Sequence, residues 1–401
     1  MKKAKRAAAL FLAALLLCLP ALAEEEEERA DQEEWTAVET LASLEDVAAS
    51  VGAAVLMERE TRSCIYESNA RTHMPIASVT KVMTLLLVTE QVDRGELDLG
   101  KKLTCSAHAA SMGGSQIYLE EGEQMTVEDL IKSVAVSSAN DAAVVLAEAV
   151  AGSEGAFVQR MNDRARELGM EDTVYANCTG LPDSAEHYSC ARDIAVLSCL
   201  LLDCDWIRKY TTIWTDTIRD GQFGLSNTNK LIRFFPGATG LKTGFTQEAM
   251  YCLSASAQRE GTEFVAVILH APSSDVRFES AKLLLNHAFA NYRLLELLPD
   301  EALPPVPVTM GMSRWVQPVP EGQGKLLLEK TMISGLRKEM SLAESVEAPV
   351  EEGQSLGWLR FLDAEGRELA RVELRAGTAV PRVTWGAVAL RLLRTIFAGT
   401  D

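Results

Sequence analysis

Three short motifs stand in one order along this 401-residue chain: Ser78-Val79-Thr80-Lys81, Ser138-Ala139-Asn140 and Lys242-Thr243-Gly244. Average residue usage gives S-x-x-K or S-x-N about once or twice by chance in a chain of this length, and K-T-G in about one chain in ten. The ordered set, with gaps of about 60 and about 100 residues, is much rarer. A fold that serves all three motifs must therefore bring three distant segments to one place.

The first motif places a hydroxyl and an amine one helical turn apart. An unbroken, largely apolar run, Val79–Glu90, predicts a buried helix with Ser78 in its first turn. Positions i and i+3 share a helix face, so the amine of Lys81 can point at the hydroxyl of Ser78. The alternative is an ordinary helix cap followed by an exposed lysine.

A serine hydroxyl is a poor nucleophile near neutral pH and needs a base within hydrogen-bond reach. Lys81 can serve as that base only where its amine is uncharged. Burial, the positive end of a helix and a second cation all lower a lysine pKa, and Lys242 is the candidate for the second cation. The motif thus predicts Ser78 as nucleophile and Lys81 as general base.

The other two motifs offer a proton relay and substrate contacts. Ser138 both donates and accepts, so it can pass a proton between the base and a leaving group. Asn140 can donate to a substrate carbonyl. On a strand edge, Lys242 and Thr243 suit a terminal carboxylate, and Gly244 lets a substrate backbone lie close. A helix-capping serine and asparagine in a loop is a compatible interpretation of the second motif.

The N-terminus has the pattern of a secretory signal. Four basic residues precede an apolar run and Ala21-Leu22-Ala23, which predicts a signal peptide over residues 1–23. An uncleaved membrane anchor is the alternative, although the apolar run is short for a bilayer span. Residues 24–40 begin with an acid-rich block, so we expect a disordered leader there.

The composition argues against several classes of partner and cofactor. The formal net charge is −18, and loss of a basic signal peptide makes the chain more acidic, so we expect no nucleic acid partner. No C-x-x-C pair occurs and the five histidines are scattered, so we expect no metal or other cofactor. Seven cysteines follow residue 23, and burial as small hydrophobes is favoured over a disulfide framework.

The hydrophobic patterns change along the chain in an order typical of an α+β domain. Residues 51–66 predict a hairpin, helices follow, and strands with a closing helix come last. We therefore expect helices packed on an antiparallel sheet within a domain over residues 41–298. The later predicted helices are Val127–Val136, Asp141–Val150, Phe157–Leu168, Ala191–Leu202 and Val276–Phe289, and the later strands are Gly240–Phe245, Tyr251–Gln258 and Glu263–Leu269.

A proline-rich break separates this domain from the C-terminal region. Short alternating runs after the break predict a small β-rich domain over residues 304–381. Residues 382–398 contain no acidic residue and place Arg391 and Arg394 opposite a broad apolar arc. This pattern predicts a cationic amphipathic helix at a membrane surface, the alternative being a terminal helix packed on its own protein.

Around the three motifs the chain resembles the D-alanyl-D-alanine carboxypeptidases, which are the low-molecular-weight penicillin-binding proteins. The resemblance covers nearly all of the chain after the signal peptide. The break, the β-rich tail domain and the terminal helix also match the family layout. Beyond the three motifs, the blocks that resemble the family are Pro75–Thr84, Asn140–Ala143, Gly180–Asp183, His187–Asp193 and Gly240–Thr246.

The resemblance implies a serine DD-peptidase with the fold shared by β-lactamases and DD-peptidases. Ser78 would attack the D-Ala-D-Ala amide of a peptidoglycan stem peptide, release the last D-alanine and be freed by water. The backbone N–H groups of Ser78 and Phe245 would form the oxyanion hole, and β-lactams would acylate Ser78 as substrate mimics. The resemblance also implies an exported enzyme at the extracytoplasmic face of the bacterial membrane, held there by the C-terminal helix.

Two positions depart from the family pattern, Ala139 in place of glycine and Cys190 in place of threonine, and neither removes a reacting group. The nearest alternative function is a β-lactamase, whose class A members carry a deacylating glutamate between the second and third motifs. Glu171 and Asp172 lie in that stretch, but Asn177 is too far along for the E-x-x-x-N spacing. A second alternative is an inactive wall-binding homologue, although every reacting side chain is present.

Overall fold

The computed structural model describes residues 41–298, 303–322 and 324–389, which form two compact units. The predicted signal peptide and acidic leader lie outside the described residues. The first unit contains residues 41–57 together with Cys64–Gln258 and Phe264–Asn286. The second contains Glu58–Ser63, Arg259–Glu263 and the described residues from His287 to 389.

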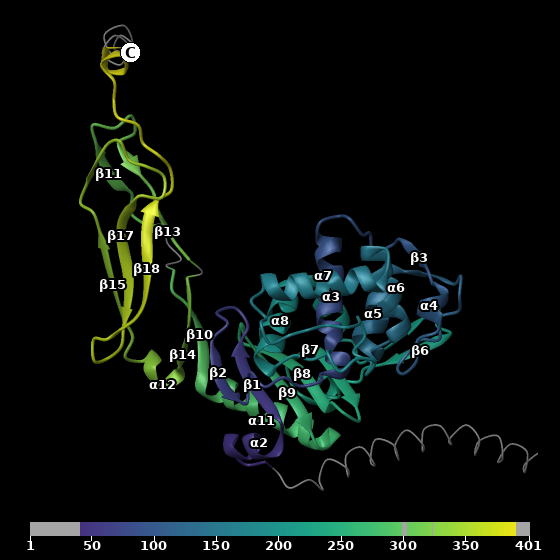
Figure 1. Cartoon of the computed structure of the whole chain (residues 1–401). Helices are drawn as coiled ribbons and strands as arrows, with labels where there is room; N and C mark the ends of the chain where they lie inside the picture. The colour runs from purple at the N-terminus through teal and green to yellow at the C-terminus, as the bar shows by residue number, and fades with distance from the viewer. Residues whose placement is uncertain (1–40, 299–302, 323, 390–401) are drawn as a thin grey trace, which may run out of the picture. The chain divides into compact units, whose positions relative to one another are not determined.

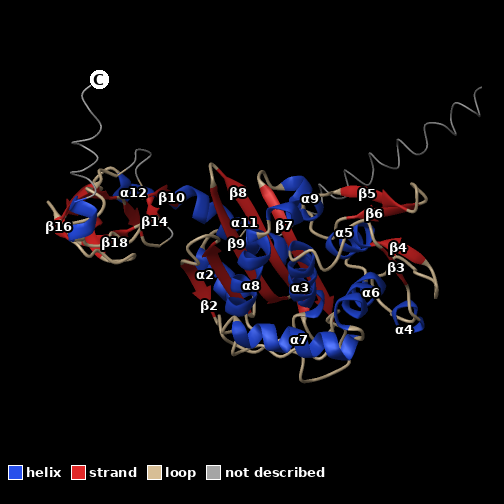
Figure 2. Ribbon diagram, turned by 90° about the horizontal axis from the view of Figure 1, so that it is seen from above, coloured by secondary structure: helices blue, strands red, loops and turns tan. Residues whose placement is uncertain are grey.

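A five-stranded sheet in the order β2-β1-β9-β8-β7 is the centre of the first unit. Its outer pairs, β1 with β2 and β7 with β8, are antiparallel. Helices lie on both faces, with α2 (Leu44–Ser50) and α11 (Ser274–Asn291) on one side and α3 (Lys81–Asp93) and α8 (Ala191–Asp203) on the other (Figure 1, Figure 2). The strands are β1 (Ala53–Glu58), β2 (Cys64–Ser68), β7 (Ala238–Thr246), β8 (Met250–Arg259) and β9 (Thr262–Ala271).

Helices are the main secondary structure between β2 and β7. The later predicted helices and strands are confirmed, and their ends fall within three residues of the predicted ones. The helices of this stretch are α3 (Lys81–Asp93), α4 (Ala107–Ala110), α5 (Val127–Ser137), α6 (Asn140–Ala151), α7 (Glu154–Glu167), α8 (Ala191–Asp203), α9 (Arg208–Thr211) and α10 (Leu231–Phe234), with the 3₁₀ turn η2 (Asp205–Ile207). Its strands form two antiparallel pairs, β3 (Lys102–Thr104) with β4 (Gln124–Thr126) and β5 (Thr215–Ile218) with β6 (Phe223–Ser226).

The local structure at Ser78 differs from the prediction. Ser78 lies in a 3₁₀ turn, η1 (Ala77–Thr80), and the α-helix α3 begins only at Lys81. Ala77 opens the turn with a φ of 46°, a left-handed backbone that a residue with a Cβ seldom adopts. Side chains three positions apart eclipse one another in a 3₁₀ turn. Ser78 and Lys81 therefore still share one face.

Strands dominate the chain after the proline-rich break. Apolar side chains such as Val306, Val350 and Leu359 fill two small cores between them. The elements are β10 (Tyr292–Glu296) paired with β14 (Lys325–Glu329), then β12 (Trp315–Val316), β11 (Val306–Thr309) and β16 (Val346–Glu347) in one sheet, and β13 (Pro318–Pro320), β18 (Glu368–Ala376), β17 (Ser355–Leu362) and β15 (Arg337–Leu342) in another, with a short helix α12 (Lys330–Ile333).

The last described residues differ from the predicted terminal helix. Arg382 is not helical, because it forms a β-bridge with Gly311 and an ion pair of 2.8 Å with Glu347. Helical residues begin at 385, and the predicted helix beyond residue 389 lies outside the described residues. No helix in the described part of the chain is long and apolar enough to span a membrane.

Candidate active site

The first motif forms a direct contact between its two functional side chains. Lys81 Nζ donates to Ser78 Oγ at 2.9 Å and to the carbonyl oxygen of Thr179 at 2.7 Å. Lys81 is completely buried at the start of α3. Burial lowers the pKa of Lys81 to about 7, against an opposing effect of neighbouring groups that include the Asp141 carboxylate. A large fraction of Lys81 amines can therefore accept a proton near neutral pH.

A polar loop before α8 holds the carbonyl group that Lys81 contacts. Asn177 Oδ1 accepts from the backbone N–H groups of Thr179, at 3.1 Å, and Gly180, at 2.7 Å. Gly180 has a φ of +81°, and a Cβ there would lie 1.9 Å from the carbonyl oxygen of Ala77. The loop therefore packs directly on η1. No sequence motif points to Thr179, since only its backbone carbonyl contacts the lysine.

The second motif connects α5 and α6. Ser138 ends α5 in the left-handed region, with a φ of 63°, and Asn140 begins α6 and donates from Nδ2 to the carbonyl oxygen of Gly113 at 2.7 Å. Ser138 Oγ and Asn140 Oδ1 are buried, and within the described part of the chain neither has a hydrogen-bond partner. Buried polar atoms are usually paired, so these two are the groups left for a bound molecule. No hydrogen bond joins Ser138 to Lys81 here.

The third motif lies in β7, at the edge of the sheet. Lys242 is buried and donates to the carbonyl oxygen of Thr243 at 2.9 Å. Burial, and then the positive charges of Lys81 and Arg277, lower the pKa of Lys242 well below its usual value. Burial is thus the main cause for both lysines, and the expected effect of Lys242 on the pKa of Lys81 is not among the causes found for Lys81. Thr243 Oγ1 donates to Thr228 Oγ1 at 2.6 Å.

Gly244 brings the first and third motifs together. A Cβ on this residue would lie 2.8 Å from the carbonyl oxygen of Ile76 and 3.0 Å from the backbone nitrogen of Ser78. Only a glycine lets η1 lie this close to β7. The close approach that Gly244 permits is therefore with the chain's own η1, which places the N–H of Ser78 beside the strand that continues to Phe245.

Arg277 is a buried cation that the sequence motifs did not identify. It lies in α11 and donates to the carbonyl oxygens of Gly244, at 3.4 Å, and Cys252, at 3.3 Å. Its guanidinium stacks 4.5 Å from the ring of Phe278. Burial lowers its pKa to about 10, so it is still charged at neutral pH. A single arginine in a closing helix has no sequence signature, and only the packing of α11 behind β7 reveals it.

A cavity of about 330 Å³ adjoins the site. Ala77 and Gly180 line it on the side of η1, and Thr246 and Glu248 line it at the far end of β7. The cavity therefore extends the site along β7 in the direction away from Lys242.

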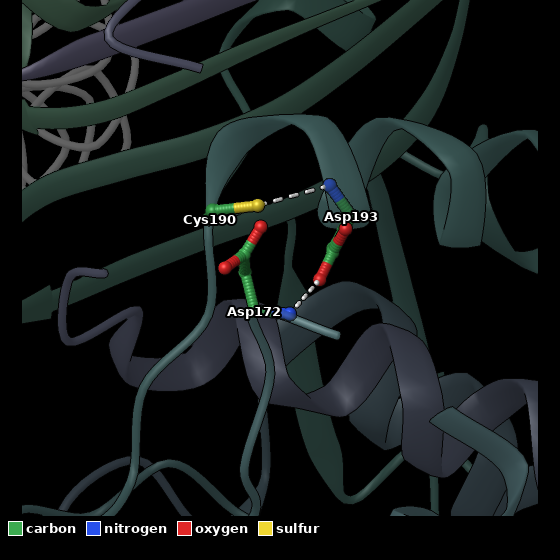
Figure 3. Close-up of side chains that lie close together, drawn as sticks. All are labelled: Asp172, Cys190 and Asp193. Carbon is green, nitrogen blue, oxygen red and sulfur yellow. Dashed lines mark hydrogen bonds between the residues drawn. The ribbon is translucent and has the colours of Figure 1, made fainter. Parts of the chain in front are cut away.

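Three potential metal ligands gather before α8, but each already has a partner in the protein (Figure 3). Asp172 pairs with Arg71 at 3.1 Å and His73 at 2.9 Å. Asp193 accepts from the N–H of Asp172 at 3.2 Å, and Cys190 Sγ accepts from the N–H of Asp193 at 3.4 Å. Burial raises the pKa of the Cys190 thiol to about 12, so it is not a thiolate at neutral pH. Cys190 is the N-cap of α8, and its thiol accepts the N–H of Asp193 in the first turn.

The remaining cysteines also have a structural explanation. None of the seven in the described part of the chain forms a disulfide, and five of them are buried. Cys190, one of the two positions that depart from the family pattern, acts as the helix cap that a threonine would otherwise supply. Asp172, one of two candidates for a deacylating carboxylate, is occupied by its ion pairs, and Glu171 is exposed.

The family model described as D-alanyl-D-alanine carboxypeptidase matches residues 38–273. The chain belongs to this family. Among its relatives, D-alanyl-D-alanine carboxypeptidase DacF of Bacillus subtilis is 38% identical over 336 residues, which cover 82% of this chain and 86% of DacF. DacC of Escherichia coli is 29% identical over 77% of this chain and 78% of its own length.

Solved structures of the carboxypeptidase family agree with this membership. Penicillin-binding protein 5 from Haemophilus influenzae superposes with a TM-score of 0.74 and 26% identity, over 83% of this chain and 98% of that structure. Penicillin-binding protein D2 from Listeria monocytogenes, in its ampicillin-bound form, gives a TM-score of 0.55 and 33% identity over 60% and 97% of the two chains. The protein is thus a serine-type peptidase of the D-alanyl-D-alanine carboxypeptidase family.

Proposed function

We propose that Ser78 and Lys81 perform the acyl transfer by which this enzyme removes the terminal D-alanine of a peptidoglycan stem peptide. The observation that carries the proposal is the 2.9 Å contact between Lys81 Nζ and Ser78 Oγ, made by a lysine whose burial lowers its pKa to about 7. A base whose pKa lies near the working pH is uncharged in a useful fraction of molecules and still binds a proton strongly enough to take it from the serine. An exposed lysine would stay charged and could not accept the proton.

The reaction proceeds in two steps. The Ser78 hydroxyl gives its proton to Lys81 Nζ while Oγ attacks the carbonyl carbon of the penultimate D-alanine. The N–H groups of Ser78 and Phe245 receive the oxyanion, and Ser138 passes the proton from Lys81 to the nitrogen of the leaving D-alanine. The C–N bond breaks and leaves an ester on Ser78. Water, deprotonated by Lys81, then cleaves the ester and restores Oγ–H.

The edge strand β7 orients the peptide. A peptide that adds antiparallel to this strand places its C-terminal carboxylate near Lys242 and Thr243, with Arg277 behind them, and its upstream residues toward Thr246. Asn140 contacts a backbone carbonyl of the same peptide. A carboxylate near Lys242 favours its charged form, so binding is expected to restore the proton that burial removes from this lysine.

The same proposal includes the location of the enzyme and its division into parts. Residues 1–23 act as a signal peptide, residues 24–40 as a leader, residues 41–298 as the peptidase domain and residues 304–381 as the β-rich domain. Residues 382–398 hold the enzyme to the outer face of the membrane. Support comes from the N-terminal signal pattern and from the acid-free composition of the last segment. β-Lactams acylate Ser78 as mimics of the peptide.

One experiment separates this function from its alternatives. The purified chain is incubated with a fluorescent penicillin and, in parallel, with diacetylated L-Lys-D-Ala-D-Ala, and D-alanine release is measured. We expect a long-lived adduct on Ser78, located by peptide mass mapping, together with D-alanine release. Rapid turnover of the penicillin without D-alanine release would indicate a β-lactamase. Absence of both adduct and release would indicate an inactive homologue.

A further inference from the structure

The connection between β11 and β12 is an exposed apolar hairpin tip. Its sequence, Thr309-Met310-Gly311-Met312-Ser313-Arg314-Trp315, differs from the polar loops that usually join two strands. The side chains of Met310, Met312 and Trp315 are 55%, 51% and 54% exposed. Met310 has a φ of 58°, so the turn holds its side chain in a backbone conformation that a methionine seldom adopts. Exposed apolar groups gathered in one loop favour a binding surface.

The tip is bonded to the segment that leads to the C-terminus. The N–H of Met312 donates to the carbonyl oxygen of Pro381 at 2.8 Å, and the N–H of Val383 donates to that of Met310 at 2.8 Å. Trp385 follows two residues later and is 90% exposed. Figure 1 shows β11 at the same end of the second unit as the last described helical residues. The tip and the start of the predicted amphipathic segment therefore form one surface.

The charge at this surface is opposite to that of the whole protein. The chain has 57 acidic residues, yet residues 302–320 and 374–400, which contain the tip and the C-terminal segment, have none. Arg314 is exposed, and no ion pair is found for it within the described part of the chain. Glu347, which lies beside β11, is neutralised by Arg382. Two acid-free segments from distant parts of the sequence thus meet at one place.

We propose that Met310, Met312, Trp315 and Arg314 form a second lipid-binding element, which enters the membrane interface beside the C-terminal segment. The proposal rests on the membrane location proposed above. Tryptophan favours the headgroup region, where its ring is apolar and its N–H stays hydrated, and arginine favours anionic headgroups. Three side chains on a hairpin tip are too small a surface for a stable dimer, so a lipid surface suits them better than a second copy.

The hairpin fixes the orientation of the enzyme on the membrane. A single amphipathic helix lets the attached protein rotate and tilt about its link. A second contact, bonded rigidly to residues 381–383, restricts that motion. The membrane therefore holds the β-rich part by two elements, and binding is expected to be stronger than the helix alone gives.

The test compares two double variants of the full chain on vesicles of phosphatidylcholine and phosphatidylglycerol at a 3:1 ratio. M312E/W315E alters the tip, and V319E/M340E alters two similarly exposed apolar residues on β13 and β15. We expect the tip variant to bind vesicles at least about tenfold more weakly than wild type, and the control variant to bind within about twofold of it. Brominated lipid should quench Trp315 fluorescence, measured as the difference between wild type and Trp315→Phe.

The possible outcomes distinguish the hairpin proposal from the proposal that the C-terminal segment is a membrane anchor. If wild type fails to bind vesicles, the membrane location itself is wrong. If deletion of residues 390–401 abolishes binding while M312E/W315E binds like the control, the anchor holds and the hairpin proposal is overturned. A dimer that the tip variant converts to monomers in sedimentation velocity would also overturn it. Equal far-UV circular dichroism and equal urea unfolding curves in all variants check that the β-rich part is folded in each one.

Discussion

The first unit buries ionisable side chains, whereas the β-rich part, residues 303–381, pairs them at its surface. Lys81, Lys242 and Asp141 are at most 1% exposed. Among the described residues of the β-rich part, Asp363 is the buried charged residue, and Arg367 pairs with it at 2.6 Å. Burying a charge costs free energy unless it is neutralised or paired. In the first unit, burial lowers the pKa values of Lys81 and Lys242, which the proposed reaction uses. In the β-rich part, most charged side chains stay at the surface, where burial costs little.

The largest expected effect is on catalysis, at a buried lysine. Lys81→Ala removes the proposed base, so acylation of Ser78 by fluorescent penicillin should slow roughly 1,000-fold. The control is Lys338→Ala, because Lys338 is exposed on β15, and it should leave the rate unchanged.

In wild type the rate of Ser78 acylation should rise with pH through about 7, since raising the pH converts Lys81 to the amine that accepts the proton. A rate independent of Lys81 and of this pH range would contradict the assignment.

The next effect tests how tightly the first unit is packed around η1. Gly180→Ala puts a Cβ 1.9 Å from the carbonyl oxygen of Ala77, in a backbone with a φ of +81°. Gly169→Ala is the matched control, because Gly169 has a φ of +69° but nothing within 4 Å of its Cβ position. The control should cost about 1 kcal/mol of unfolding free energy, from backbone strain alone, and Gly180→Ala at least about 3 kcal/mol.

Urea unfolding measures both glycine variants. Because Gly180 packs against the turn that carries Ser78, its variant should also acylate more slowly, while the control keeps the wild-type rate. Equal losses of stability in the two variants would show that the loop moves away from η1 without cost.

These two sites also show what the sequence could and could not predict. Local patterns placed the helices and strands of the first unit, because an apolar period of 3.6 or 2 residues is a property of neighbouring residues. The 3₁₀ turn at Ser78 was missed, since it depends on the contact with Gly180, which lies about 100 residues away in sequence. Thr179 and Arg277 were missed because the first acts through its backbone and the second through packing of α11 behind β7.

A smaller effect concerns the buried His187, which is hydrogen-bonded to Thr80 Oγ1 at 2.7 Å and through Nδ1 to the N–H of Ala176 at 3.2 Å. Burial lowers the pKa of His187 to about 4, whereas the unfolded chain takes up a proton near pH 6.5. The unfolded state therefore binds more protons between these values, and unfolding free energy falls as the pH drops through that window. The loss should reach about 3 kcal/mol at pH 4.

Replacement of the imidazole tests whether His187 causes this loss of unfolding free energy. His187→Gln keeps an amide that can donate to Thr80 but has no proton to gain. Its unfolding free energy should therefore fall less than that of wild type between pH 6.5 and pH 4, when both are measured by urea titration. If the two proteins lose stability in parallel, the acid sensitivity of the first unit comes from groups other than His187.

The smallest effect is expected in the β-rich part and completes the contrast. Arg360 donates twice to Glu339 across β17 and β15, at 3.0 and 2.7 Å, and stacks 4.5 Å from the ring of Trp358. Both charges stay partly exposed, so screening by water leaves little net attraction. A double-mutant cycle with Arg360→Ala and Glu339→Ala should give a coupling below about 1 kcal/mol, and 0.5 M salt should reduce it further. A coupling of several kcal/mol would mean that this pair is as strongly desolvated as Lys81, and that the two parts of the molecule do not differ in how they use charge.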